Sequence, residues 1–436
     1  MRIFHISTRL ILGGSQENTV LSCEGQAMRG HEVHLAFGPI YGPEGSLLER
    51  VERFNRAHAD NPIRTHIVPH LVREVRPTAD ARALRELRRL VLELGPDVVH
   101  THSSKAGVLG RIAAWREGGR AGRIRVVHTI HGPPFMPVEG GAAARANVRL
   151  NNVLYTIAER FAARRCHTII SVADAMTRQF LSRGIGRDEQ YVTVASGMET
   201  EPFLNAAPGE DRASVRARLG LCGDDFVIGT VARLAQHKGH DDLLDALADD
   251  LRTHPRWKLL WVGDGWWRDR LIAKARAFGI AVRTIDDAAA PSGPRPTNAP
   301  PPTPDAAAQL IITGLVPPER IPGLMRAMDV LAHPSYREGL PRTVPQALLA
   351  GVCPIAYDCD GTPEVVREGE TGFLVPTGDR AALRAAVLRA AANPADRTAM
   401  AARGRDECAR RFDVGRMIDA LQAVYEGRTP GEEARP

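Results

Sequence analysis

Lysine and aromatic residues are both scarce in this 436-residue chain. Only four of its 57 cations are lysine, and aromatic residues make up 5% of the sequence. Such a bias toward arginine is typical of a GC-rich coding sequence, so the formal charge of +6 is weak evidence for a polyanionic partner. Because basic and aromatic residues do not interleave either, the sequence argues against nucleic-acid binding.

Long apolar runs and paired cysteines are missing as well. No segment approaches the roughly 18 uninterrupted apolar residues of a transmembrane helix. The first nine residues carry a charged or polar group every few positions, which predicts a first β-strand rather than a signal peptide. The six cysteines are scattered without a CxxC pair or metal-ligand spacing, which predicts reduced, mostly buried thiols in a cytoplasmic protein without a metal centre.

Short β-branched runs alternate with longer helical stretches along the whole chain, which is the pattern of parallel sheets wound with helices. The expected strands are 2–7, 32–36, 64–68, 97–101, 125–129, 168–172 and 191–194, and then 226–230, 258–262, 281–285, 310–312, 329–332, 353–357 and 372–375. The same architecture thus occurs twice. It predicts an α/β chain of two Rossmann-like domains that face each other across a ligand cleft.

The domain boundary is expected in a segment rich in Gly, Pro, Asn and acidic residues that has no strong strand pattern. We expect an N-terminal domain at 1–200, a linker at 201–225, a C-terminal domain at 226–412, and a final helix and tail at 413–436 that pack back on the first domain. The Pro- and Ala-rich segment 286–308 predicts a mobile surface insertion, with a docking site for an SH3-like partner as the rarer alternative.

Two strand-to-helix turns carry residues suited to an anion. Gly13 and Gly14 follow the first strand and open a helix, where a close backbone approach and the helix N-terminus favour an anion, although a Gly-Gly pair is at least as often only a turn. Arg233 and Lys238 follow the first strand of the second domain, just before a helix that starts at Gly239. A guanidinium fork and an ammonium group suit phosphate oxygens, and the strand-end position favours this interpretation over a solvated basic loop.

The loop after the expected strand 329–332 carries a carboxylate, and the helix that follows it carries an amide. Glu338 lies in the loop after the expected strand 329–332, and Gln346 lies in the helix that follows. Both side chains can face a polyhydroxyl ligand such as a sugar or a ribose.

His131 lies just after the expected strand 125–129 and is followed by Gly-Pro-Pro, a rigid turn. It is either a ligand contact or a structural histidine. His100 and His102 lie on the neighbouring strand end, but no carboxylate or cysteine is spaced to complete a metal site with them.

Taken together, the motifs resemble a retaining glycosyltransferase of family 4 with the GT-B fold, over nearly the whole chain. These motifs are RLAQHKG at 233–239, VGDG at 262–265, GLVP at 314–317, HPS at 333–335, EGL at 338–340, TPE at 362–364 and GETGFLV at 369–375. In the first half, the segments 101–111, 128–135 and 196–204 resemble a bacterial surface-polysaccharide branch of the family.

The resemblance implies a role for each matching position. The donor diphosphate would be held by Arg233 and Lys238, and the Gly13-Gly14 loop would approach it from the other domain. The transferred sugar would contact Glu338 and His131. The backbone of Gly339, Leu340 and Pro341 would assist Glu338, and Gly314, Leu315 and Val316 would line the base pocket. Gln346 replaces a Glu that usually binds the ribose, so binding is expected with a different strength.

The resemblance also implies the reaction and its partners. A hexose or N-acetylhexosamine would pass from a nucleotide sugar, preferably UDP-linked, to a glycan or lipid-linked acceptor without a metal or a further cofactor. Residues 1–200 carry a net charge of +8, so arginines of 81–90 and 111–125 are candidates for peripheral contact with an anionic inner membrane face; ordinary solvated helix faces are the alternative.

A different class of protein is the main alternative. A catalytically silent sugar-nucleotide-binding or scaffold protein is suggested by Gln346 and by the Pro-rich insertion. An epimerase of the same fold has no positive signal of its own.

Overall fold

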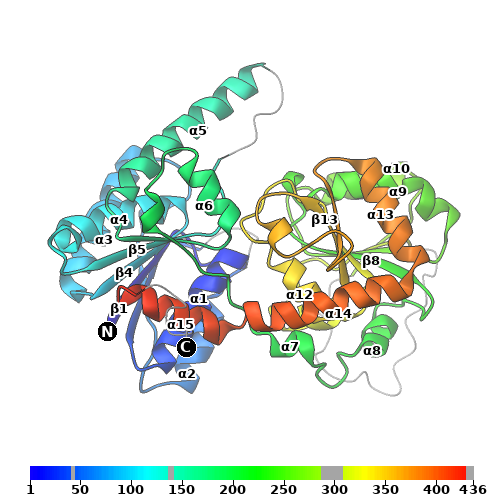
Figure 1. Ribbon diagram of the computed structural model, residues 1–436, viewed down its shortest axis with the longest axis horizontal. Coiled ribbons are helices and arrows are strands. Elements are labelled where there is room, and N and C mark those ends of the chain that lie inside the picture. The colour runs from blue at the N-terminus through cyan, green and yellow to red at the C-terminus, as the bar shows by residue number, and fades with distance from the viewer. Residues whose placement is uncertain (41–44, 136–141, 286–307, 429–436) are drawn as a thin grey trace. The chain divides into compact units, whose positions relative to one another are not determined.

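The computed structural model describes residues 1–40, 45–135, 142–285 and 308–428. The chain forms two compact units, Met1–Met198 with Phe412–Pro436 (unit 1) and Glu199–Arg411 (unit 2). Each unit contains a seven-stranded parallel sheet with helices on its faces (Figure 1), which confirms the expected α/β class. Of the expected insertion at 286–308, only the buried Ala308 belongs to the described residues.

The sheet of unit 1 has the strand order β3-β2-β1-β4-β5-β6-β7. Its strands are β1 (Arg2–Ser7), β2 (Glu32–Phe37), β3 (Arg64–Ile67), β4 (Val98–His102), β5 (Arg125–Ile130), β6 (Thr168–Ser171) and β7 (Tyr191–Thr193). Its helices are α1 (Gly14–Met28), α2 (Leu48–Ala57), α3 (Pro77–Leu94), α4 (Ser104–Glu117), α5 (Ala142–Ala163), α6 (Asp174–Leu181) and α15 (Val414–Tyr425). Short 3-10 helices occupy Gly119–Ala121 and Asp188–Gln190.

The C-terminal helix α15 belongs to the core of unit 1, as the sequence predicted. Met417, Ile418 and Leu421 recur at helical spacing and pack against Ile3 of β1 and Leu21 of α1. The Asp413 side chain accepts a hydrogen bond from the Arg416 N–H and caps the helix. The contact with α1 needs a glycine, because a Cβ on Gly25 would lie 2.5 Å from the Ile418 side chain.

The sheet of unit 2 has the strand order β10-β11-β9-β8-β12-β13-β14. Its strands are β8 (Phe226–Val231), β9 (Trp257–Val262), β10 (Val282–Thr284), β11 (Leu310–Ile312), β12 (Val330–His333), β13 (Cys353–Asp358) and β14 (Phe373–Pro376). Its helices are α7 (Glu201–Leu204), α8 (Arg212–Arg218), α9 (His240–Thr253), α10 (Arg268–Ala277), α11 (Ile321–Arg326), α12 (Thr343–Leu349), α13 (Arg380–Ala392) and α14 (Pro394–Arg411). Short 3-10 helices occupy Gln236–Lys238, Pro318–Arg320 and Thr362–Glu364.

The segment expected to be a linker, 201–225, carries the helices α7 and α8 and groups with unit 2. Its ionic contacts explain this placement. Arg216 of α8 donates to the Asp329 carboxylate at 2.6 Å and to the Ala327 carbonyl at 2.9 Å, and both groups lie just before β12. The Gly, Pro, Asn and acidic residues of the segment suggested a linker and gave no sign of these long-range polar contacts.

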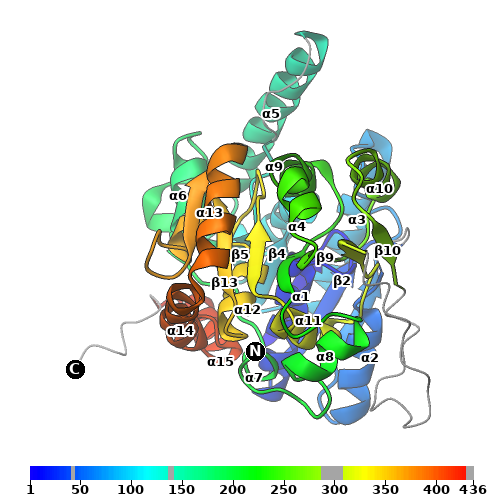
Figure 2. The same cartoon turned by 90° about the vertical axis from the view of Figure 1, so that its right-hand side faces the viewer.

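Helix α5 extends away from the sheet of unit 1 in both views (Figures 1 and 2). Within the described residues, no helix combines the length and the apolar character that a membrane crossing requires.

Candidate active-site residues in each unit

Lys238 and Glu338 form an ion pair at one edge of the sheet of unit 2. The two residues follow β8 and β12, which are parallel neighbours in the sheet, so their loops emerge at the same edge. The same Glu338 oxygen, Oε1, also lies 3.0 Å from Nε2 of His333 at the end of β12. All three side chains are more than four-fifths buried, with exposed fractions of 18% for Lys238, 13% for Glu338 and 5% for His333.

The surroundings of Glu338 keep its carboxylate ionised. Burial opposes ionisation, but the Lys238 ammonium and the hydrogen bond from His333 outweigh it and hold the pKa of Glu338 well below its ordinary value. Burial, followed by the charge of Lys238, lowers the pKa of His237 to about 4, so His237 is neutral at pH 7. Arg233 acts in the same direction on His237. The site therefore offers the anionic acceptor Glu338 beside Lys238, Arg337 and Arg233.

Backbone contacts fix the two loops against each other. Ser335 Oγ and the Tyr336 N–H both donate to the His237 carbonyl, at 3.1 and 2.8 Å. The Glu338 N–H donates to the Asp360 carboxylate at 2.8 Å. Asp360 has a φ of +49°, a left-handed conformation that is uncommon for a residue other than glycine. Such conformations cluster at functional sites, where surrounding contacts enforce them.

A second pair of turns, which follow β9 and β11, brings two glycines together. Gly263 after β9 and Gly314 after β11 form an isolated antiparallel bridge. Gly263 has a φ of +139°, and a Cβ on it would lie 2.3 Å from the Ala232 carbonyl oxygen, so only glycine fits. Next to the bridge, Leu315 is 40% exposed and Val316 is buried.

The remaining predicted donor-site residues lie on the same edge of unit 2. Gly339 accepts a hydrogen bond from the Gly361 N–H at 3.1 Å. Leu340, Pro341 and Gln346 are buried. Arg233 is partly exposed in the turn after β8. The structure thus brings Lys238 and Glu338 into direct contact, and sequence reasoning did not foresee that they pair.

Two residues of this site were missed as individual candidates. His333 lies in the motif HPS at 333–335, but the sequence alone did not assign a role to this histidine. Asp360 gave no signal at all, because a single aspartate before Gly-Thr-Pro is typical of an ordinary turn. Its contact with the Glu338 N–H depends on the register between β12 and β13.

In unit 1, the predicted residues lie at the ends of β1 and β5. Gly13 is the N-cap of α1 and accepts a hydrogen bond from the Glu17 N–H at 2.9 Å, and Gly14 is the first helical residue. His131 follows β5 directly and is partly exposed. Its Nε2 lies 3.1 Å from Nδ1 of His102, the last residue of β4.

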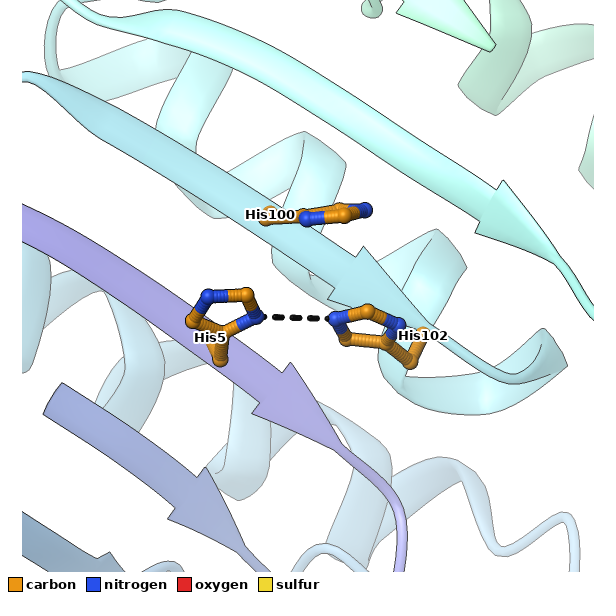
Figure 3. A group of neighbouring side chains, drawn as sticks. All are labelled: His5, His100 and His102. Atoms are coloured by element: carbon orange, nitrogen blue, oxygen red, sulfur yellow. Dashed lines mark hydrogen bonds between the residues drawn. The ribbon is translucent and has the colours of Figure 1, made fainter. Parts of the chain in front are cut away.

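Three buried histidines of unit 1 come close enough to be considered as metal ligands. One ring nitrogen from each of His5, His100 and His102 lies within 4.8 Å of the others, and Figure 3 shows the three rings on β1 and β4. The sequence gave no sign of this cluster, because His5 joins it only through the pairing of β1 with β4. Both nitrogens of each ring already have hydrogen-bond partners. Elsewhere in the described ranges, Cys222, Asp224 and Asp225 form a second such group, and two of these residues are exposed.

Comparison with family models gives two matches that together span most of both units. Residues 12–201 match Glycosyltransferase Family 4. Residues 211–285 and 305–407 match Glycosyl transferases group 1.

Two relatives and one solved structure match between 78% and 98% of the chain. The UDP-Gal:alpha-D-GlcNAc-diphosphoundecaprenol alpha-1,3-galactosyltransferase of Escherichia coli is 26% identical, over 98% of this chain and 96% of its own length. The putative glycosyltransferase EpsD of Bacillus subtilis is 27% identical, over 78% of this chain and 79% of its own length. The crystal structure of Anabaena HepE in complex with UDP and glucose matches with a TM-score of 0.74 at 20% identity, covering 98% of this chain and 99% of that one.

Proposed function

Because the chain belongs to the family-4 glycosyltransferases with the GT-B fold, we propose that it transfers a hexose or N-acetylhexosamine from a UDP-linked donor to a glycan or lipid-linked acceptor. Such a reaction would serve polysaccharide or glycolipid biosynthesis in the cytoplasm. The observation that carries the proposal is the buried Lys238–Glu338–His333 cluster at the carboxyl edge of the sheet of unit 2. In open α/β sheets, ligands bind at this edge.

In this proposal, Lys238 and Arg233 receive the donor diphosphate. Lys238 contributes a point charge and Arg233 a fork of N–H donors, and both are placed where negative charge develops as the sugar leaves. Gly13 and Gly14 would approach the same diphosphate with the backbone and the N-terminus of α1. Gly314, Leu315 and Val316 would contact the base, and Gln346 the ribose.

The ionised Glu338 can only accept hydrogen bonds, which suits the hydroxyl groups of the transferred sugar. The contacts of its main chain with Asp360 and of its side chain with His333 hold the carboxylate in place. His131 would contact the same sugar from unit 1.

The proposed transfer retains the configuration at the anomeric carbon and needs no metal ion. The acceptor hydroxyl forms the new bond on the face from which the diphosphate departs. The bond between the anomeric carbon and the diphosphate oxygen breaks, and a diphosphate oxygen takes the proton of the hydroxyl. The protein's contribution is positive charge at the leaving group and exclusion of water.

A nucleotide-sugar panel tests this proposal. The purified chain is incubated with UDP-glucose, UDP-galactose, UDP-N-acetylglucosamine and GDP-mannose, and release of nucleoside diphosphate is measured with and without a polyprenyl-diphosphate-linked sugar. We expect turnover of a UDP-linked donor, and a loss of about a hundredfold in kcat/KM for Arg233→Ala, the scale of one donor to a developing oxyanion. Donor binding without turnover, with activity appearing only in Gln346→Glu, would instead indicate a silent sugar-nucleotide-binding protein.

Helix α5 supports the idea that the enzyme reaches its acceptor at a membrane surface. Its apolar residues Leu150, Val153, Leu154, Ile157 and Phe161 follow one face at helical spacing, and each is 46–58% exposed. The arginines of α5 are exposed, and its single acidic residue is buried. The exposed side chains of the helix therefore combine apolar surface with positive charge. An amphipathic helix of this composition suits the interface of an anionic bilayer.

The structure removes one residue from the arginines that the sequence suggested for such a contact. Arg111, one of the arginines considered for lipid contact, is fully buried in α4. Its guanidinium donates to the Glu159 carboxylate of α5 at 2.6 Å and to the Gly107 carbonyl at 2.8 Å. The charge of Arg111 therefore holds α5 on the unit rather than facing lipid.

We expect Leu154→Glu/Ile157→Glu to weaken binding to vesicles of equal parts phosphatidylglycerol and phosphatidylcholine by about tenfold or more, because two apolar contacts are replaced by charges that the lipid repels. Vesicle flotation is the measurement. The double variant Val75→Glu/Leu92→Glu is the matched control, since these residues of unit 1 are 71% and 62% exposed but lie outside α5. Equal loss in both variants, or equal binding to pure phosphatidylcholine, would contradict a role of α5.

A further inference from the structure

A continuous chain of hydrogen-bonded polar side chains in unit 1 connects the buried residues Gln26, His5 and His102 with the partly exposed His131. Nδ1 of His102 lies 3.1 Å from Nε2 of His131, and Nε2 of His102 lies 2.9 Å from Nδ1 of His5. Nε2 of His5 lies 2.7 Å from the amide oxygen of Gln26 in α1. Figure 3 shows the central step, the hydrogen bond between His5 on β1 and His102 on β4.

The amide of Gln26 sets the direction of every hydrogen bond in this chain. An amide oxygen can only accept, so Nε2 of His5 carries the proton and donates. A neutral His5 then has an unprotonated Nδ1, which accepts from Nε2–H of His102. By the same step, Nδ1 of His102 accepts from Nε2–H of His131. Three rings therefore share one tautomer, Nε2–H.

The other end of the Gln26 amide fixes a second branch in the same sense. Its nitrogen donates to the Tyr425 hydroxyl oxygen at 2.9 Å. The Tyr425 hydroxyl in turn donates to Nδ1 of His100 at 2.6 Å, and Nε2–H of His100 donates to Thr129 Oγ1 at 2.7 Å. His100 is thus a fourth Nε2–H ring, and α15 contributes to the network through Tyr425.

Burial keeps the rings of His5, His100 and His102 neutral, and the assigned hydrogen-bond directions require neutral rings. Desolvation lowers the pKa of His5 to about 4, although the hydrogen bond to Gln26 opposes the effect. Burial, followed by the neighbouring histidines, lowers the pKa values of His100 and His102 well below 6.5. Inverting the Gln26 amide would reverse every bond and move every proton to Nδ1, so the chain has two complete and opposite states.

We propose that Gln26, acting through His5 and His102, is a positioning residue that holds His131 as the Nε2–H tautomer with Nδ1 as its hydrogen-bond acceptor. This inference deepens the proposed function and rests on its placement of His131 beside the transferred sugar. As the bond to the diphosphate breaks, the sugar gains positive charge. An imidazole lone pair stabilises that charge, whereas an N–H group directed at it would oppose it.

The hydrogen-bond chain also answers the question of a metal at His5, His100 and His102. A metal ion would need an unprotonated nitrogen from each ring, directed at one point. In the structure, each of the six nitrogens meets a partner that already uses it. The cluster therefore acts as a proton-ordered network.

Ring nitrogen-15 spectra of the full-length protein labelled at histidine test the proposal at pH 7.5. We expect His5, His100, His102 and His131 in the Nε2–H form. His128 is the internal contrast. Its Nδ1 lies 3.1 Å from the Thr101 carbonyl, which can only accept, and 2.9 Å from Thr101 Oγ1, whose hydroxyl donates to the Val127 carbonyl, so we expect His128 in the Nδ1–H form. Protonated Nδ1 on His131 would overturn the proposal, as would stoichiometric bound metal on the three clustered rings.

Two substitutions of Gln26 then separate the relay from a packing role. Gln26→Glu keeps an acceptor for His5, so we expect His131 to retain its tautomer and kcat/KM for UDP-glucose to stay within about threefold. Gln26→Met removes the acceptor and leaves a buried N–H unpaired, so we expect the chain to reverse, His131 to become Nδ1–H, and kcat to fall about tenfold, the worth of one hydrogen bond.

A second histidine pair in the same sheet provides the matched control. Glu32 accepts from Nε2 of His34 at 3.2 Å, and Nδ1 of His34 lies 2.9 Å from Nε2 of His66. His66→Phe should therefore leave the His131 signals and turnover unchanged. Unchanged His131 signals in Gln26→Met would refute the relay. Absence of turnover in the wild type, with the expected spectra, would refute only the proposed function.

Discussion

Lys238→Met is expected to lower kcat/KM for the UDP-linked donor by about a hundredfold to a thousandfold. The substitution keeps the length of the side chain but removes the charge proposed to face the leaving diphosphate. Removal of one preorganised donor to a developing anion costs on that scale. Because the loss concerns charge that develops in the transition state, kcat should fall more than KM rises.

The same substitution should also change the behaviour of Glu338. Lys238 is the main charge that opposes the effect of burial on this carboxyl group. Without it, burial is opposed by the contact with His333 but no longer by the ammonium group, so the pKa of Glu338 rises above its value in the wild type and the carboxylate takes up a proton at a higher pH. We therefore expect the acid limb of the pH profile of residual turnover to move to higher pH in Lys238→Met.

Steady-state kinetics with three variants separate these effects. Lys238→Arg retains the charge and should recover most of the turnover. Lys274→Met is the matched control, because Lys274 is also ion-paired in unit 2, 3.0 Å from Asp241 and 2.6 Å from Asp245 on α9. We expect this control to stay within about twofold of the wild type. A loss of less than tenfold in Lys238→Met would contradict the phosphate role.

The sequence predicted the fold well, because the relevant signals are local. Each expected strand of unit 2 lies within about two residues of an observed one. The breaks between α13, α14 and α15 fall at Asn393-Pro394 and Phe412-Asp413, where Asn, Pro and Asp are typical of helix boundaries. The exception is 201–225. Helix α8 of this segment is held by ion pairs with Asp329, more than a hundred positions away along the chain. The sequence of the segment alone does not indicate these ion pairs.

The candidate site was predicted in its residue types but not in its contacts. Lys238 and Glu338 were identified separately, from the chemistry of each side chain. The charge of Lys238 compensates that of Glu338 because β8 and β12 are neighbours in the sheet, and the sequence does not show this neighbourhood. In unit 1, the chain from Gln26 to His131 was not predicted at all. It joins β1, β4, α1 and the end of β5, and a buried histidine looks the same in sequence whether or not it is part of a network.

Gly239→Ala is expected to destabilise unit 2 by about 3 kcal/mol and to abolish most donor turnover. Gly239 has a φ of +70°, which costs an alanine about 1 kcal/mol or more. In addition, a Cβ would lie 1.9 Å from the Pro334 carbonyl oxygen, a backbone atom that cannot rotate away. Overpacking of this kind adds about 1 to 3 kcal/mol.

The expected clash lies between the two loops that carry Lys238 and Glu338. The His237 carbonyl, next to this lysine, accepts hydrogen bonds from Ser335 and Tyr336. If the loops separate to admit the methyl group, these bonds and the Lys238–Glu338 pair are strained together. Stability and turnover should therefore fall in the same variant, because one close approach of backbone supports both.

Thermal unfolding of the full chain measures the effect. For a unit of this size, about 3 kcal/mol corresponds to a fall of about 6 to 12 °C in Tm. Gly351→Ala is the matched control, since Gly351 has a φ of +77° in the same unit and a Cβ on it would meet no atom within 4 Å. It isolates the conformational cost, so we expect a fall of about 2 to 4 °C and unchanged turnover. If the two variants lost the same stability, the close approach at Pro334 would not be what requires glycine at position 239.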